Sequence, residues 1–495
     1  MRVTLSPTLA LCATLLALSA SCSSLREGEG EDAGPPGPTL PDGAPRPTVP
    51  SASEGGVPSD GATPVLPDAD LADTSVPDAG PDSGTAGLRV ESITIGENVA
   101  CAVFAGGTMR CWGDYRLAGG GASGTPKPSA IPRRVSDGGG FLSGVAEVNA
   151  SFRHACARLL DGTFACWGFN NEYQLGDFTR DINQDIATTP FARTVKDSSG
   201  AGPILRAAAG LAGTGRVSAG AFVSAAIGDQ GSILTWGSGS ALGRGNPALA
   251  EAIVPKPVIA THVDGSPPPA DDRLLGATHV EMARLHGCAS ITGNKVVCWG
   301  DNTSGKLGIG NGVPVNDGRP RTVVVPDSTG LLRVSTGDTS SCAVTGLGRV
   351  RCWGANNLGQ AGKEPTGGTQ MDVSLDVMKL DGAPLDQIVD VGVGDGFACA
   401  LSSATAGGKV YCWGTASQNV LGDGTTVARG RAGAIASALV PTKVDLVGAR
   451  LLAVGDATAC VVLGERDIRC WGRGPIGERG ASSSASSIPR SVDDL

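Results

Sequence analysis

Short apolar runs recur along residues 88–495, separated by polar, glycine-rich segments. Each unit contains a run with Cys-Ala or a related pair and, about ten residues later, a run that ends in Trp-Gly. Runs of this length between turn residues predict β-strands, and recurrence at a long, regular spacing indicates a repeat architecture. The seven tryptophans, spaced 54 to 69 residues apart, are Trp112, Trp167, Trp236, Trp299, Trp353, Trp413 and Trp471. We therefore expect an all-β fold of seven repeats.

The two runs of each unit are predicted to pair as a hairpin. In HACARLLDGTFACWG the spacing centres the turn on Asp161, and the last position of the three-residue loop requires left-handed backbone. Glycine or asparagine fills this position at Gly107, Gly162, Gly231, Asn294 and Gly348, whereas Arg466 breaks the rule and the sixth hairpin is longer. A small residue five positions before each Cys position predicts a bend or a close backbone approach. These residues are Gly96, Ser151, Gly220, Ala283, Gly337, Gly394 and Gly455.

The hairpin register places two cysteines of a unit opposite each other, within reach of a disulfide. The expected pairs are Cys101–Cys111, Cys156–Cys166, Cys288–Cys298, Cys342–Cys352, Cys399–Cys412 and Cys460–Cys470. The third unit lacks both members, with Ala225 and Thr235 in their places, as a bonded pair predicts. The alternatives are free buried thiols and zinc, but no CxxC spacing supports a zinc site.

A polar loop follows several Trp-Gly pairs, as in WGFNNEYQLG, WGDNTSGKLG and WGANNLGQAG, and then a Pro-containing strand such as SAIPRRV. This pattern, over residues 88–495, resembles the regulator of chromosome condensation repeat, whose members fold as seven-bladed β-propellers. The resemblance implies protein binding through loops on the propeller faces, and we interpret the tryptophans as wedges between blades. Because the first repeat has no preceding Pro-containing strand, we expect the C-terminal strand within Ile488–Leu495 to close the first blade.

The N-terminus resembles an exported bacterial lipoprotein. Residues 1–21 combine Arg2, an apolar stretch and small residues, which is typical of a signal peptide. Cys22 has no partner among the paired cysteines and stands at the predicted cleavage site, so we predict that it is lipidated. Lipoprotein signals usually carry Leu three residues before the Cys, where this chain has Ser19. The alternative is ordinary signal peptidase cleavage near Ala20 or Ser21.

Residues 22–87 are predicted to be a disordered Pro/Gly/Asp-rich tether, because they contain too few apolar residues to offset the entropy of ordering. The alternative is a disordered tail with no spacer role. Residues 23–87 hold 12 acidic residues and 2 arginines, so the net charge of −9 comes from this segment and residues 88–495 are formally neutral. A neutral body has no long-range field to attract nucleic acid or anionic lipid.

No catalytic or cofactor motif is recognisable. His154 and His286 occupy one repeat position, which favours a structural role, and His262 and His279 belong to no motif. The oxygen-rich segment Asp181–Asp185 suggests calcium, but Ile186 stands where a calcium loop needs glycine. We predict no enzyme activity, metal or cofactor.

The sequence therefore predicts a monomeric, non-catalytic protein-binding or scaffold propeller over residues 88–495, with an unidentified protein partner and no nucleic acid. Its membrane contact is a lipid anchor to the bacterial envelope, at the outer membrane or cell surface. The alternative is an exported inhibitor that blocks a target enzyme with one propeller face. A third class, an enzyme, would need His and carboxylates converging on the central channel.

Overall fold

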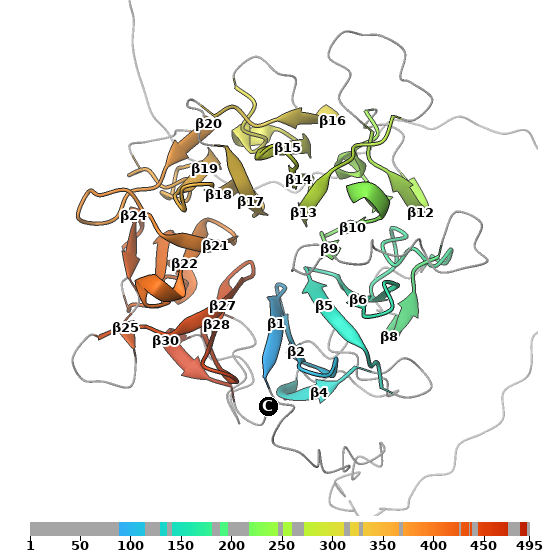
Figure 1. Cartoon of the computed structure of the whole chain (residues 1–495), viewed down its shortest axis with the longest axis horizontal. Helices are drawn as coiled ribbons and strands as arrows, with labels where there is room; N and C mark the ends of the chain where they lie inside the picture. The colour runs from blue at the N-terminus through green and yellow to red at the C-terminus, as the bar shows by residue number, and fades with distance from the viewer. Residues whose placement is uncertain are drawn as a thin grey trace, which may run out of the picture. The chain divides into compact units, whose positions relative to one another are not determined.

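The computed structural model describes residues 89–113, 129–135, 141–180, 189–196, 217–245, 251–259, 272–310, 317–325, 330–365, 370–424, 427–434, 436–437, 444–473 and 486–492. These residues form seven four-stranded antiparallel sheets around a central axis (Figure 1), which confirms the seven-bladed β-propeller. The predicted signal peptide (residues 1–21), Cys22, the predicted tether (residues 22–87), His262 and the segment 181–185 lie outside the described residues. No helix in the described part of the chain has the length and apolar character to cross a membrane.

Each blade is one continuous stretch of sequence whose four strands run in order from the axis outward (Figure 1). The first three blades comprise β1 (Val90–Ile95), β2 (Val99–Phe104), β3 (Met109–Gly113) and β4 (Ser129–Arg134); β5 (Val145–Ala150), β6 (His154–Leu159), β7 (Phe164–Gly168) and β8 (Thr189–Thr194); and β9 (Val217–Ala219), β10 (Val223–Ile227), β11 (Ile233–Ser238) and β12 (Glu251–Pro257).

The next three blades comprise β13 (Ala277–Met282), β14 (His286–Ile291), β15 (Lys295–Gly300) and β16 (Asp317–Thr322); β17 (Leu331–Thr336), β18 (Ser340–Thr345), β19 (Val350–Ala355) and β20 (Gln370–Asp376); and β21 (Ile388–Val393), β22 (Phe397–Ser402), β23 (Val410–Gly414) and β24 (Arg429–Ala434). Blade 7 comprises β27 (Ala449–Val454), β28 (Thr458–Leu463), β29 (Asp467–Gly472) and β30 (Ser486–Ser491).

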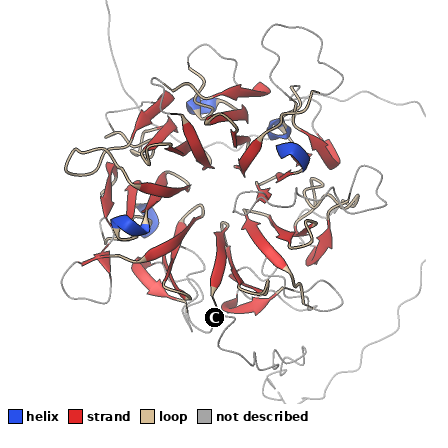
Figure 2. Ribbon diagram, in the orientation of Figure 1, coloured by secondary structure: helices blue, strands red, loops and turns tan. Residues whose placement is uncertain are grey.

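The remaining elements are small. β25 (Ala436–Ser437) and β26 (Val444–Asp445) form a separate two-stranded sheet. The helical elements of the described residues are single 3-10 turns (Figure 2), namely η1 (Asp229–Gly231), η2 (Ser240–Leu242), η3 (Thr303–Gly305), η4 (Ala404–Ala406) and η5 (Ser417–Asn419).

The predicted hairpin register is the observed one. The two cysteines of each unit are directly opposed, as in Cys101↔Cys111 and Cys288↔Cys298. All six pairs lie at disulfide distance, with sulfur atoms 1.93–2.12 Å apart. Ala225 and Thr235 face each other in the blade that lacks the pair. In the seventh hairpin the residue with left-handed backbone is Gly464 rather than Arg466. It stands at the first position of the three-residue loop instead of the last.

The tryptophans pack between blades, as predicted, and all seven side chains are fully buried. The indole N–H groups of five of them, Trp236, Trp299, Trp353, Trp413 and Trp471, donate to a backbone carbonyl of the preceding blade, for example Trp353 to Lys306 O at 2.9 Å and Trp413 to Gln360 O at 3.1 Å. The glycine that follows each tryptophan has a φ between 102° and 113°. This left-handed backbone interrupts the pairing of the third and fourth strands with a bulge, and explains why glycine follows every tryptophan.

The C-terminal strand does not close the first blade, contrary to our expectation. β30 pairs with β29 and is the outer strand of blade 7, while β4 completes blade 1. The Pro-containing strand therefore follows its Trp-Gly strand within a blade instead of preceding it. No blade needs a strand from elsewhere in the chain, because every repeat already holds four.

The ring closes instead through contacts that recur at the other blade junctions. Val90 N donates to Glu465 O of the blade 7 hairpin at 2.9 Å, as Val145 N does to Gly107 O and Leu331 N to Asn294 O. The Arg450 guanidinium adds bonds to the carbonyls of Val90 and Glu465.

The small residue of each repeat marks a close approach of neighbouring blades, as predicted. A side chain at Gly455 would lie 2.6 Å from Gly96 O across the closing junction, and one at Gly337 would lie 2.4 Å from Gly394 O. Distances below 3.0 Å leave no room for a Cβ atom, so Gly455 and Gly337 could not be replaced without a shift of the backbone, whereas two other repeats carry Ser151 and Ala283 at this position.

Candidate functional site: the central channel

A cavity of about 470 Å³ lies on the axis and is lined by the first strands of all seven blades. One end is ringed by the turns that join the first and second strands. We call this end the turn mouth; its ring is Glu97, Phe152, Ala221, Arg284, Asp338, Asp395 and Asp456. The loops that follow Trp-Gly begin against these turns, as in Asp301 N to Leu285 O at 3.0 Å, so both belong to one surface, the turn face. The opposite surface, the hairpin face, carries the hairpins between second and third strands.

Four carboxylates gather on one side of the turn mouth, on the adjacent blades 5, 6, 7 and 1. Burial, together with the negative charges of Asp338, Glu97 and Asp395, raises the pKa of Asp456 to about 7. Burial also raises the pKa of Asp338, with Asp395 adding to the effect. The pKa of Glu97 is raised by burial, although Arg473, 3.9 Å away, opposes the rise. These acidic groups share one repulsive environment, which a positive charge would relieve.

The other side of the turn mouth is aromatic and basic. The Arg153 guanidinium lies 5.3 Å from the ring centre of Phe152, 5.8 Å from that of Phe169 and 5.3 Å from that of Phe222, within cation–π range. Phe152 keeps 38% of its exposure and Leu285 keeps 41%, so apolar surface remains open to solvent beside the cavity. The turn mouth is therefore acidic on one side and apolar on the other.

Deeper charged groups of the cavity wall form ion pairs. Glu147 lies 3.2 Å from Arg158 of the second strand, β6, and Arg333 lies 3.0 Å from Asp390. His279 Nε2 lies 3.6 Å from Glu281 Oε2. Burial raises the pKa of Glu281 to about 8, and the Arg333 charge opposes that rise.

These channel residues were not predicted from the sequence, because no motif links residues on four blades. The signal that could have found them is the repeat register, since Glu147, His279, Arg333 and Asp390 all stand four positions before the small residue of their unit. This places a His and carboxylates on the channel. Among the described residues, however, no group of three or more His, Cys, Asp or Glu side chains could hold a metal ion.

The two repeat histidines serve the junctions between blades. His154 Nε2 lies 2.6 Å from Ser224 Oγ of the next blade, and Ser224 Oγ donates to Gln174 O at 2.7 Å. His286 and Ser341 repeat the arrangement at 3.0 Å. Because each of these serines donates to a carbonyl, the histidine donates from Nε2, and burial lowers the pKa of both rings to about 3. These contacts agree with a structural role.

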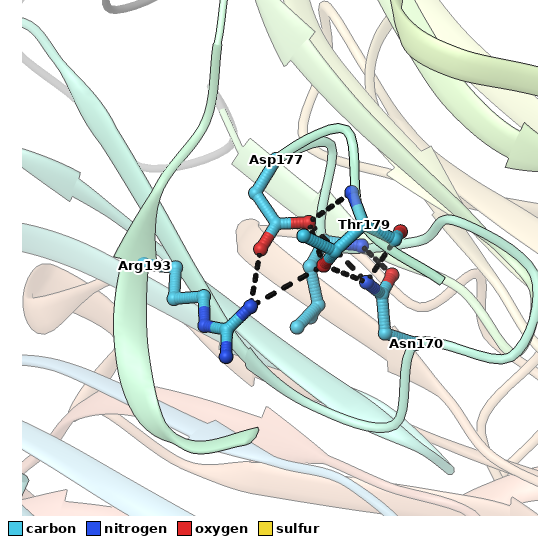
Figure 3. A network of polar contacts seen from close by, with 5 residues as sticks. Asn170, Asp177, Thr179 and Arg193 are labelled. Atoms are coloured by element: carbon cyan, nitrogen blue, oxygen red, sulfur yellow. Dashed lines mark hydrogen bonds and ion pairs between the residues drawn. The ribbon is translucent and has the colours of Figure 1, made fainter. Parts of the chain in front are cut away.

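The Asn-rich loops of the turn face are also built by internal contacts (Figure 3). Asn170 accepts from Leu175 N at 3.0 Å and donates to Thr179 O at 2.7 Å. Asp177 accepts from Thr179 Oγ1 and pairs with Arg193 of the outer strand at 2.9 Å. The loop thereby holds Gln174, whose carbonyl receives the Trp236 indole at 2.8 Å. Asn170 therefore stabilises the conformation of its loop, and the ordered loop forms part of the surface around the turn mouth.

Comparisons with known proteins agree with this architecture. Residues 333–360 match the family model of the Regulator of chromosome condensation (RCC1) repeat. This stretch, which runs from β17 into the loop after β19, is thus similar to one such repeat. The chain is 27% identical over 349 residues to the human E3 ubiquitin-protein ligase HERC2, an alignment that covers 68% of this chain and 6% of HERC2. It is 24% identical over 283 residues to Protein pim1 of Schizosaccharomyces pombe, covering 54% of this chain and 47% of pim1. The chain thus spans less than half the length of these relatives.

Solved structures share the fold of this repeat propeller. Human WBSCR16 superposes with a TM-score of 0.56 at 16% identity, covering 74% of this chain and 85% of that protein. Prp20p of Saccharomyces cerevisiae superposes with a TM-score of 0.53 at 17% identity, covering 74% of this chain and 80% of Prp20p. Prp20p has been characterised for its binding to Gsp1p and histones.

Proposed function

We propose that this protein is a non-catalytic, protein-binding propeller displayed on the bacterial envelope, and that the turn face is its docking surface. The observation that carries the proposal is the turn mouth, where exposed Phe152 and Leu285 stand beside a charged cavity. Apolar side chains rimmed by charge are typical of protein interaction sites. The binding of Gsp1p and histones by Prp20p, which shares the fold, supports a binding role.

Export and anchoring form the second part of the proposal. Six cysteine pairs at disulfide distance suit an oxidising compartment. Cys22 would then carry the lipid, with residues 22–87 as the tether. Metabolic labelling with a fatty-acid probe tests this step: the wild-type chain should incorporate label, and Cys22→Ser should not. An unlabelled wild type found wholly in the soluble fraction would refute the anchor.

The docking face is tested by capture from envelope extracts with the full chain as bait. Phe152→Asp with Leu285→Asp alters the turn face; Leu160→Asp with Leu347→Asp places the same two charges on hairpin tips that are 68% and 65% exposed. We expect the first variant to lose the captured protein and the second to retain it. The reverse result would assign binding to the hairpin face. If neither variant changes what is captured, the binding proposal fails.

A second candidate function is inhibition of an exported enzyme. It is favoured by the preformed turn mouth, because rigid, exposed contact residues bind with little ordering cost. If the captured protein is an enzyme, adding the purified propeller should abolish its activity, and the turn-face variant should not. If the captured enzyme keeps its full activity when it is saturated with the propeller, inhibition is excluded and the scaffold role remains.

A further inference from the structure

Large side chains gather on the turn face of the adjacent blades 2, 3 and 4. We call Phe152, Arg153, Phe222 and Leu285 the aromatic strip. The last three stand three positions before the Cys position of their repeats. The other repeats have a small or an uncharged polar residue at this position, namely Asn98, Thr339, Gly396 and Ala457. Four blades therefore form without a large side chain here, and the fold does not by itself require the strip.

Arg153 gives the strip a positive charge that is not used in an ion pair. Within the described part of the chain, its guanidinium makes three contacts with phenylalanine rings, given above, and no ion pair. Burial raises the pKa of Glu97, and the charge of Arg153 opposes that rise less than two other arginines do. Arg284 differs, because its charge acts on three carboxylates of the turn mouth.

The rings hold the guanidinium and leave its outer N–H groups within reach. Nε of Arg153 is enclosed without a hydrogen-bond partner among the described residues, whereas the residue as a whole is partly exposed. The Nη groups are therefore the part of the guanidinium that a guest can reach. Aromatic rings stabilise the charge but do not provide the in-plane acceptors that a carboxylate offers to this fork of donors. A carboxylate would pair with a guanidinium that is already held in place, at little ordering cost.

We propose that Arg153 receives the carboxylate of an aspartate or glutamate side chain of the bound protein. The inference rests on the proposed binding function and names the partner's chemistry: an acidic residue flanked by large apolar residues. The acid pairs with the guanidinium. Its apolar neighbours pack on the rest of the aromatic strip, where Phe152 is 38% and Leu285 41% exposed.

The test selects ligands for the purified full chain from a displayed library of random peptides, which are fused through their C-termini and so have no free terminal carboxylate. Selected peptides should share an aspartate or glutamate next to a large apolar residue, and Arg153→Gln should not enrich them. Arg466→Gln removes an exposed arginine from the blade 7 hairpin on the opposite face. This matched control should enrich the same peptides as the wild type.

A double-mutant cycle, measured by calorimetry on a selected peptide, separates a charge pair from a structural role of Arg153. Replacing the peptide's acid by its amide should weaken binding to the wild type about tenfold or more, and Arg153→Gln should weaken binding of the parent peptide to a similar extent. The amide peptide should bind wild type and Arg153→Gln equally, because no charge pair remains to be lost. If Arg153→Gln weakens both peptides by the same factor, Arg153 only supports the turn and the inference fails.

Three other results would overturn the inference. Benzoate, which has a carboxylate and a ring but no flanking chain, should bind at least about tenfold more weakly than the peptide, and equal binding would assign the site to small aromatic acids. Enrichment of peptides that lack an acid, or of no peptide, would also contradict it. If envelope capture is lost in Phe152→Asp with Leu285→Asp but retained in Arg153→Gln, this inference fails while the binding function stands.

Discussion

Glu281 should destabilise the folded protein at neutral pH, and Glu281→Gln should relieve that cost. Burial in the channel wall raises the pKa of this carboxyl from 4.5 to about 8. The folded state therefore holds a proton at pH 7 that the unfolded state releases. The contribution of Glu281 to stability is greatest below pH 4.5 and is lost as pH rises towards 8. Glutamine has the shape of the protonated acid and takes up no proton on folding.

The magnitude follows from the pKa values. One pKa unit corresponds to about 1.4 kcal/mol, so the interval from 4.5 to pH 7 gives about 3.5 kcal/mol as an upper limit. The side chain keeps 25% of its exposure, and water in the channel lowers the effect to about 2 kcal/mol. Glu281→Gln should therefore be more stable than wild type by about 2 kcal/mol at pH 7.

The assay is urea unfolding at pH 7 and at pH 4, followed by tryptophan fluorescence. At pH 4 both states of the wild type are protonated at Glu281, and the difference between the proteins should shrink below about 0.5 kcal/mol. His154 and His286, whose pKa values burial lowers to about 3, titrate in both proteins and cancel in the comparison. The exposed Glu91→Gln serves as the control and should leave stability unchanged. A difference that persists at pH 4, or is absent at pH 7, would refute the reasoning.

Three further predictions address the fold. Trp353→Phe removes the indole hydrogen bond to Lys306 O and part of the side chain that packs between the blades, and should lower the free energy of unfolding in urea by about 1–3 kcal/mol. The loss stays within this range because Ser341 still donates to the same carbonyl at 3.1 Å. An unchanged free energy of unfolding would contradict the interpretation of the tryptophans as wedges between blades. Deleting 486–495 removes the outer strand of blade 7 and should lower stability by several kcal/mol, whereas deleting the tether 23–87 should leave the melt unchanged; equal melts would show that β30 contributes nothing. Non-reducing peptide maps should give six local cross-links, and a long-range pair such as Cys101 with Cys470 would contradict the hairpin register.

The fold was predictable because its determinants are local. The spacing of Cys156 and Cys166 sets a hairpin turn, the turn sets the register, and the register places the sulfur atoms together. The small residues predicted close backbone contacts, and these contacts lie between blades. The Pro-containing strand was assigned to the wrong blade, because the repeated sequence does not indicate which strand begins a blade. The pairing of β29 with β30 shows that this strand is the last of its blade.

The channel was harder to predict, because its chemistry is shared between blades. Glu281 and Asp390 lie over a hundred residues apart, and nothing near either one marks it as a cavity residue. The mouth carboxylates become a group only when the ring brings their turns together. Aligning the repeats by their small residue predicts which positions share a level of the channel. The alignment does not predict the charge state of these side chains or their ion pairs, because the residue type at each position differs from blade to blade.

The junction between blades 7 and 1 has a consequence for the order of the chain. Val90 N bonds to the blade 7 hairpin as Val145 N bonds to that of blade 1, so the closing junction shares a backbone contact with junctions inside the ring. The point at which the chain begins is then arbitrary with respect to the architecture. A circular permutant that starts at blade 2 and ends with blade 1 would break one loop and keep every strand pair. New chain termini are therefore best placed between two blades, where they interrupt no strand pairing.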